Sequence, residues 1–229
     1  MLVNSEMEYQ KAIAYIFQLI KEGKLIIGSK IPSERDLAET LGIGRNSTRE
    51  AISILRGMGI IESVHGSGNY ITANGGAAIK QIVSAMLALG SISRTDIQRF
   101  RRALSASICR YISDNEFDAG KRARIEAILL EMDGATREDF ARLDWEFHMT
   151  LIRATENPMF AIMVEPVAEL YLELIRDVIV SCDEETVKKF LVIHQGIYDS
   201  IVNKDMQSCS EYIREHYELA EKQIKQHTL

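Results

Sequence analysis

The chain has 229 residues, of which 46% are hydrophobic and 26% are charged, and its formal net charge at pH 7 is −6. This composition is typical of a globular protein with room for one large or two modest domains. No stretch approaches the ~20 apolar residues of a membrane-spanning helix, so we expect no membrane partner. The N-terminal ten residues lack the basic start and apolar core of a secretory signal, so we expect a cytoplasmic protein.

The cysteines agree with that location. Cys109, Cys182 and Cys209 are few, odd in number and far apart. This pattern predicts neither a disulfide framework nor a thiolate metal site, and we expect three buried thiols in a reducing compartment.

The charge is unevenly distributed along the chain. Residues 1–74 carry eight Lys/Arg and eight Asp/Glu, whereas residues 75–229 carry the other 19 and 25. A neutral N-terminal part can still bind DNA if its arginines share one face. Its non-specific affinity is then modest, because the phosphate contribution grows with the number of cations engaged.

The first predicted element is an amphipathic helix over residues 6–22, followed by a short extended piece that leads to Pro32. A second helix begins after Ser33, whose hydroxyl suits an N-cap, and ends at Gly42. Its apolar positions, Leu37, Ala38 and Leu41, recur at helical spacing.

A third helix is predicted to start near Arg45. One face is apolar, and the opposite face carries donors that suit phosphates and base edges: Arg45, Asn46, Ser47 and Arg49. They cluster in the N-terminal part of the helix, which meets the bases in helix-turn-helix docking.

A β-hairpin is predicted next. Two apolar runs, residues 60–64 and 70–71, flank the Gly-rich turn His65-Gly66-Ser67-Gly68. His65 and Gly66 at the tip are placed to reach a groove or a phosphate. Residues 1–74 therefore read as a winged helix-turn-helix, with residues 75–77 as a linker.

Residues 78–229 are predicted to form an all-α bundle, so the whole chain is mostly α. The expected helices cover residues 78–90, 94–113, 118–132, 137–156, 158–180, 184–203 and 206 to near the end. Ser181 and Glu184 are expected to open the helix at 184.

Polar groups recur on the apolar faces of this second domain. Asp144 and His148 are four residues apart and so share a helix face, and His194 and His216 each lie among apolar neighbours. Three imidazoles and a carboxylate would make a divalent metal site if the fold brought them together. The alternative is that they are core histidines with ordinary hydrogen-bond partners.

The string IPSERDLAETLGIGRNSTREAISILRGMGIIE, followed by GSGNYI, resembles the GntR family of bacterial transcription regulators over roughly residues 8–72. The resemblance implies that two such domains in a homodimer bind double-stranded operator DNA. The implied contact residues are Arg35, Arg45, Asn46, Ser47 and Arg49 from the helices, with His65 and Gly66 from the wing.

The string DWEFHMTLIRATENP is similar to the FCD ligand-binding domain of the FadR subgroup, whose length residues 78–229 cover. The resemblance implies that Asp144, His148, His194 and His216 hold a divalent metal, zinc first, with nickel or another transition metal as alternatives. It also implies that a small organic acid completes the coordination, with Arg101 or Arg102 pairing with its carboxylate.

The sequence thus predicts a metabolite-responsive transcription factor, with repression favoured over activation. A metal-dependent enzyme is the alternative from another class, because three histidines and a carboxylate could activate water. No motif supplies a general acid or base beside them, so we expect no enzyme. In a third alternative the metal is purely structural or is itself the signal.

Overall fold

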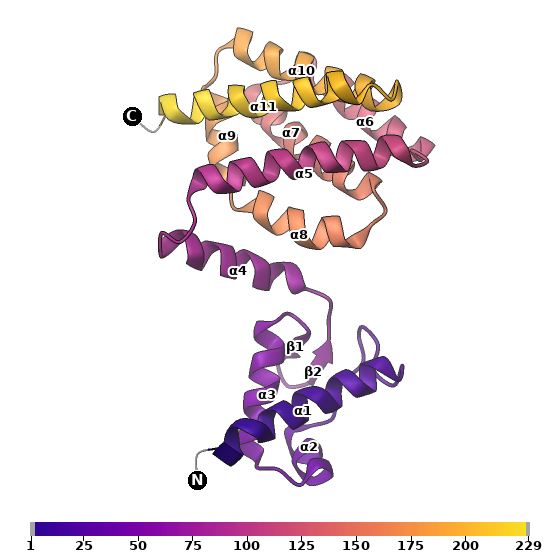
Figure 1. Cartoon of the computed structure of the whole chain (residues 1–229), viewed down its shortest axis with the longest axis vertical. Coiled ribbons are helices and arrows are strands. Elements are labelled where there is room, and N and C mark those ends of the chain that lie inside the picture. The colour runs from indigo at the N-terminus through magenta and orange to yellow at the C-terminus, as the bar shows by residue number, and fades with distance from the viewer. Residues whose placement is uncertain (1–2, 228–229) are drawn as a thin grey trace. The chain divides into compact units, whose positions relative to one another are not determined.

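The computed structural model describes residues 3–227, with side chains described for residues 8–226. The chain divides into two compact units, Met1–Gln81 and Ile82–Leu229 (Figure 1). The division differs from the predicted linker, because residues 75–77 form the first turn of helix α4 (Gly75–Ala88), which spans the boundary.

The first unit contains the predicted helices and hairpin. Its elements are α1 (Val3–Lys21), α2 (Glu34–Leu41), α3 (Arg45–Gly57), β1 (Ile61–Val64) and β2 (Gly68–Ile71). Ser33 caps α2 as predicted, because its hydroxyl accepts from the Asp36 amide while the Asp36 carboxylate accepts from the Ser33 amide. Gly42 ends α2 in the left-handed conformation, with φ 63°.

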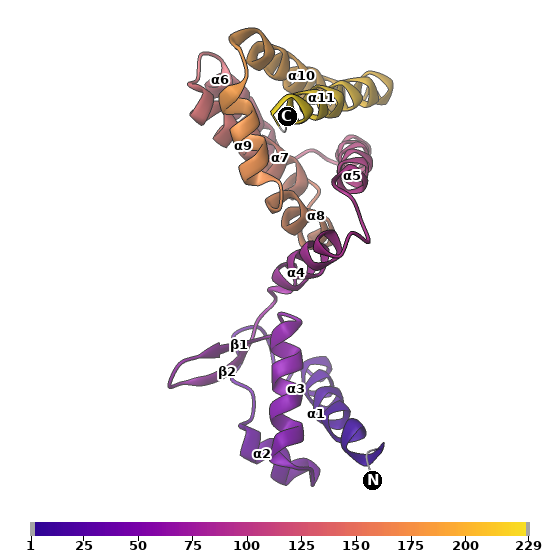
Figure 2. The ribbon, with the colours of Figure 1, turned by 90° about the vertical axis from the view of Figure 1, so that its left-hand side faces the viewer.

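The strands form an antiparallel hairpin in which Ile61 pairs with Ile71 and Val64 with Gly68. Helix α3 packs against both α1 and α2, and its C-terminal end lies next to β1 of the hairpin (Figure 2). The apolar faces of all five elements meet in one core: Ile16, Leu25, Ile31, Leu37, Ile52, Leu55, Ile61 and Ile71. This core is what holds the exposed face of α3 beside the wing.

The second unit is all-helical, as predicted. After α4 it contains α5 (Arg94–Asp114), α6 (Ala119–Met132), α7 (Arg137–Ala154), α8 (Pro158–Glu169), α9 (Leu172–Ser181), α10 (Glu184–Val202) and α11 (Met206–His227). Helices α10 and α11 lie side by side, and α7 packs on α6, α8 and α9 (Figures 1 and 2). Among the described residues, no helix is both long and apolar enough to span a bilayer. Cys109, Cys182 and Cys209 are buried free thiols, as expected.

The predicted helix over residues 158–180 is wrong, because the chain turns at Leu170–Tyr171 and forms α8 and α9 instead. Tyr171 is 3% exposed, and its hydroxyl donates to the carbonyl of Arg94 at 3.2 Å. Helix-compatible residues occupy the turn, so periodicity does not reveal it; burial of the Tyr171 ring in tertiary contacts decides the break.

Helix α10 begins at Glu184, as predicted, but its N-cap is not the expected Ser181. Its N-cap is Asp183, whose carboxylate accepts from the Thr186 amide at 2.7 Å, and Ser181 instead ends α9. Asp and Ser are similarly good N-caps, so the residue types alone do not choose between these two positions.

Candidate metal centre and DNA-binding face

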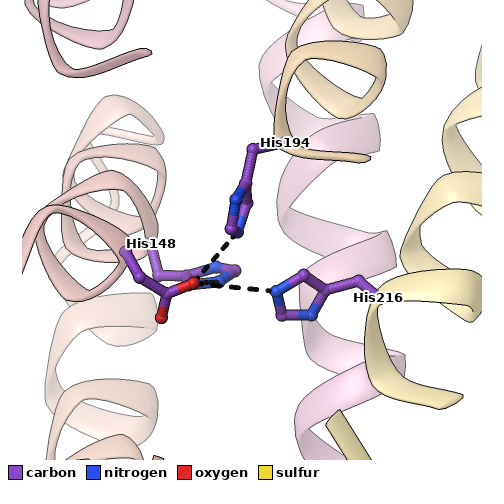
Figure 3. Close-up of side chains that lie close together, drawn as sticks. His148, His194 and His216 are labelled. Atoms are coloured by element: carbon purple, nitrogen blue, oxygen red, sulfur yellow. Dashed lines mark ion pairs between the residues drawn. The ribbon is translucent and has the colours of Figure 1, made fainter. Parts of the chain in front are cut away.

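Four side chains with metal-binding groups converge inside the helical unit. Asp144 and His148 lie one turn apart on α7, His194 comes from α10, and His216 comes from α11. One ligand atom from each residue can be chosen so that all four lie within 4.8 Å of one another. Figure 3 shows the three imidazoles directed towards one carboxylate. The fold therefore brings together the complete set that the sequence singled out.

The three imidazoles point their Nε2 atoms at the same oxygen. Oδ1 of Asp144 lies 3.1 Å from Nε2 of His194 and 3.9 Å from Nε2 of both His148 and His216. The ring centroids of the histidines are 4.9–5.3 Å apart. A single small ion placed among these atoms would meet three nitrogens and one oxygen.

Apolar packing holds the imidazoles in place. His194 has no exposed surface, and its ring centroid lies 4.7 Å from that of Phe147. The His216 ring lies 5.7 Å from Phe190 and 5.3 Å from Tyr217. Such packing keeps the His194 and His216 rings in one orientation and shields them from bulk water.

The hydrogen bonding of the buried ring nitrogens indicates whether these residues fit a metal ion. Among the described residues, neither ring nitrogen of His194 or His216 has a hydrogen-bond partner, so the 3.1 Å contact lacks hydrogen-bond alignment. Core histidines are normally satisfied, which argues against the alternative of ordinary hydrogen-bonded groups. Three imidazoles and a carboxylate suit zinc, nickel and similar ions, and so the residues fit.

Burial shapes the protonation of the cluster. It lowers the pKa of His148 well below its ordinary value and that of His216 below it, opposed only in part by Asp144. Burial by itself would raise the pKa of Asp144, but the adjacent His194 and His216 outweigh it and hold this pKa well below the usual range. Neutral imidazoles and an ionised carboxylate are the forms that bind metal.

The structure distinguishes the two predicted effector arginines. Arg101 is half-buried, and its guanidinium carbon lies 5.4 Å from the ring centroid of Tyr171 and 5.8 Å from that of Tyr217. Arg102 is exposed on another face of α5. Only Arg101 is therefore placed beside the cluster.

Two small cavities adjoin the cluster, and Arg101, His148, His216 and Tyr217 line both. One, of about 40 Å³, is otherwise mostly apolar; the other, of about 20 Å³, is also lined by Asp144 and Gln98. The sequence reasoning missed Gln98, although its position three residues before Arg101 puts both on one face of α5.

The DNA-binding candidates of the first unit are mostly exposed on α2, α3 and the wing. Arg35 pairs with Glu39 at 3.2 Å and Arg49 with Glu34 at 3.1 Å. The exposed candidates are Arg35, Arg45, Asn46, Arg49, His65 and Gly66. Exposed ion pairs of this kind contribute little to stability, so phosphate can replace the carboxylates at small cost.

Ser47 departs from this pattern. Its side chain is buried, and its hydroxyl donates to Oε2 of Glu8 at 2.8 Å, while the Gly44 amide donates to the same oxygen at 3.2 Å. Ser47 thus ties the start of α3 to α1 rather than facing solvent. The sequence grouped it with the exposed donors because Glu8, 39 residues away, is not visible in the local pattern.

Comparisons with known proteins agree with this architecture. Residues 8–71 match the model of the bacterial regulatory proteins of the gntR family, and residues 84–219 match the FCD domain. The HTH-type transcriptional regulator LutR of Bacillus subtilis is 28% identical over 80% of this chain and 85% of its own length. The HTH-type transcriptional repressor NanR of Klebsiella aerogenes is 28% identical over 62% of this chain and 56% of its own length.

Among solved structures, Streptococcus agalactiae GntR matches with a TM-score of 0.69 and 22% identity, over 93% of this chain and 99% of that one. This likeness shows a shared fold. The matching families and relatives are transcription regulators and not enzymes, which removes the metal-dependent enzyme as an explanation of the cluster. The chain belongs to the GntR family of DNA-binding transcription regulators and carries an FCD domain.

Proposed function

We propose that this regulator is a homodimeric repressor whose affinity for operator DNA changes when a small carboxylate binds at a metal held by Asp144, His148, His194 and His216. The observation that carries the proposal is the buried cluster, in which the nitrogens of two histidines have no partner among the described residues. The similar protein NanR is a transcriptional repressor, which supports repression as the direction of control.

In this proposal Arg35, Arg45, Asn46 and Arg49 bind operator phosphates and bases, and His65 and Gly66 contact DNA from the wing. The exposure of these side chains on one unit supports the assignment. Arginine can donate two parallel hydrogen bonds to guanine, which suits Arg45 at the start of α3. We expect Ser47 to act indirectly, by holding that helix start against α1.

The metal would give the sensor an anchor for an acid. Bound there, it would supply a positive charge that attracts a carboxylate, and Arg101 would donate to the same group from the other side. A guanidinium suits this task because its paired N–H groups match the two carboxylate oxygens. The two tyrosine rings beside Arg101 keep its planar group in place.

The surface of helix α4 supports the proposed dimer. Helix α4 contributes no buried side chain, and it exposes the apolar residues Ile82 and Met86. An uncovered apolar helix face favours association with a second copy. Two-fold symmetry would then set two recognition helices against two half-sites about one DNA turn apart. The acid changes operator affinity to the extent that it binds the two arrangements differently.

The test begins with an operator selected by the wild-type protein from a random duplex library. Fluorescence anisotropy then measures operator affinity with and without small carboxylates, and elemental analysis measures metal content. We expect metal in the wild type, its loss in His194→Ala, and an acid that weakens operator binding in the wild type alone. Wild-type protein that binds no metal, or whose operator affinity no acid changes, would contradict the proposal.

The DNA face has a matched control. Arg45→Ala should weaken operator binding by about 1–3 kcal/mol if the residue reads a base, whereas Arg153→Ala, in the helical unit, should not.

The second candidate function, in which the metal itself is the signal, rests on the same cluster. Operator affinity that follows zinc concentration without any added acid would favour it.

A further inference from the structure

Gln98 on α5 carries a polar group that the fold leaves unused. Its side-chain nitrogen Nε2 is buried and has no hydrogen-bond partner among the described residues. Gln98 lines the 20 Å³ cavity together with Asp144, His148 and His216. A buried amide donor without a partner destabilises the folded protein, so its position calls for a ligand that accepts a hydrogen bond.

The orientation of the amide follows from its neighbour. Nη1 of Arg101 lies 3.3 Å from Oε1 of Gln98 and donates to it. A guanidinium can only donate, so the amide oxygen must face Arg101 and the NH2 end must be the one left over. In the flipped orientation, the NH2 group of Gln98 would face the N–H groups of Arg101, and neither could accept a hydrogen bond.

The two cavities differ in what they can hold. The 20 Å³ cavity has room for roughly one water-sized group, and the 40 Å³ cavity for roughly three. Ile108, Val164 and Ile213 line the larger one. A short carbon chain therefore suits the larger cavity and a single polar group suits the smaller.

From these contacts we infer that the sensed acid carries an acceptor oxygen, hydroxyl or oxo, on the carbon next to its carboxylate, and that Gln98 Nε2 donates to that oxygen. The inference rests on the proposed carboxylate sensing. Arg101 and Gln98 are in direct contact, so their remaining donors lie close together, which suits a carboxylate and an oxygen on the adjacent carbon of one ligand. Gln98 is then a specificity-determining residue.

The experiment uses isothermal titration calorimetry of the zinc-loaded full-length protein with two probes, 2-hydroxybutanoate and butanoate. The wild type should bind the hydroxy acid roughly five- to tenfold more tightly, the value of one hydrogen bond. Gln98→Leu should bind both acids alike, with butanoate affinity within about twofold of wild type. Gln207→Leu, an exposed control on α11, should keep the wild-type preference.

The outcomes separate this inference from the proposed function. A preference that survives in Gln98→Leu, or an equal loss for both acids, overturns the role of Gln98 and leaves carboxylate sensing intact. Binding of neither acid to the wild type overturns carboxylate sensing and this inference together. If Gln98→Leu does not fold, Gln98→Met decides, because its uncharged side chain has a similar length and cannot donate a hydrogen bond.

Discussion

Alanine at Gly196 should destabilise the helical unit, although alanine is the better helix former. Gly196 lies in α10, and a Cβ built there would stand 2.5 Å from Cζ of Tyr212 and 2.6 Å from both of its Cε atoms. Tyr212 belongs to α11, so this contact sets how closely the two helices approach. His194 and His216 lie within one turn of it, and the substitution should therefore also disturb the cluster.

The magnitude follows from two opposing terms. Replacing a mid-helix glycine by alanine gains about 1 kcal/mol. Overpacking a core typically costs about 1–3 kcal/mol, and three contacts below 3.0 Å on a rigid ring place Gly196 in the upper half of that range. The net loss is about 1–2 kcal/mol, which for a unit of this size lowers the melting temperature by about 2–8 °C.

The assay can isolate the helical unit. Trp145, on α7, is the chain's single tryptophan, so its fluorescence during thermal unfolding reports on that unit and not on the DNA-binding unit. Combining Gly196→Ala with Tyr212→Leu should remove the clash, so the double variant should lose less stability than the two single losses added together. A Gly196→Ala protein as stable as wild type, or strict additivity in the double variant, would refute the steric argument.

Three further outcomes are expected. Ser33→Ala should cost about 0.5–2 kcal/mol at the start of α2, seen as faster amide hydrogen exchange in that helix with α5 unchanged. The Ser33 hydroxyl and amide lower the pKa of Asp36 from its ordinary 3.8, so the ionised carboxylate stabilises the folded unit above that pH. The protection of α2 amides from hydrogen exchange should therefore fall as the pH drops through the lowered pKa. Asp36→Asn should remove this pH dependence. Removing the metal with a chelator should lower the melting temperature followed by Trp145 fluorescence by about 5–11 °C. This range corresponds to the ~2.7 kcal/mol that a ligand at a hundredfold its Kd contributes to stability. The chelator should not change the melting temperature of His194→Ala. Equal shifts in both proteins would argue that the chelator acts elsewhere.

Much of the DNA-binding unit was predictable from the sequence alone. As predicted, Ser33 caps the start of α2 and Gly42 its end, α3 begins at Arg45, and a Gly-rich turn connects the strands of the hairpin. These signals are local, because caps, turns and helical periodicity depend on residues a few positions apart. The exception is Ser47, whose role depends on the distant Glu8.

The candidate metal centre was only partly visible in the sequence. Asp144 and His148 share a face of one helix, so their proximity follows from spacing. His194 and His216 reach Asp144 only because α10 and α11 pack on each other and direct these two side chains towards α7. No local rule sets those distances, and residue types alone left open whether the histidines were ordinary core groups; the resemblance to FCD domains pointed to a metal set.

Tertiary structure alone decided the surroundings of the cluster. The break between α8 and α9 places the Tyr171 ring beside Arg101, and it interrupts a run that the periodicity read as one helix. The same packing leaves Arg101 half-buried and Arg102 exposed, and it leaves Nε2 of Gln98 without a hydrogen-bond partner among the described residues. Periodicity reports which helix face is apolar, whereas the neighbours of a polar group on that face depend on how separate helices dock.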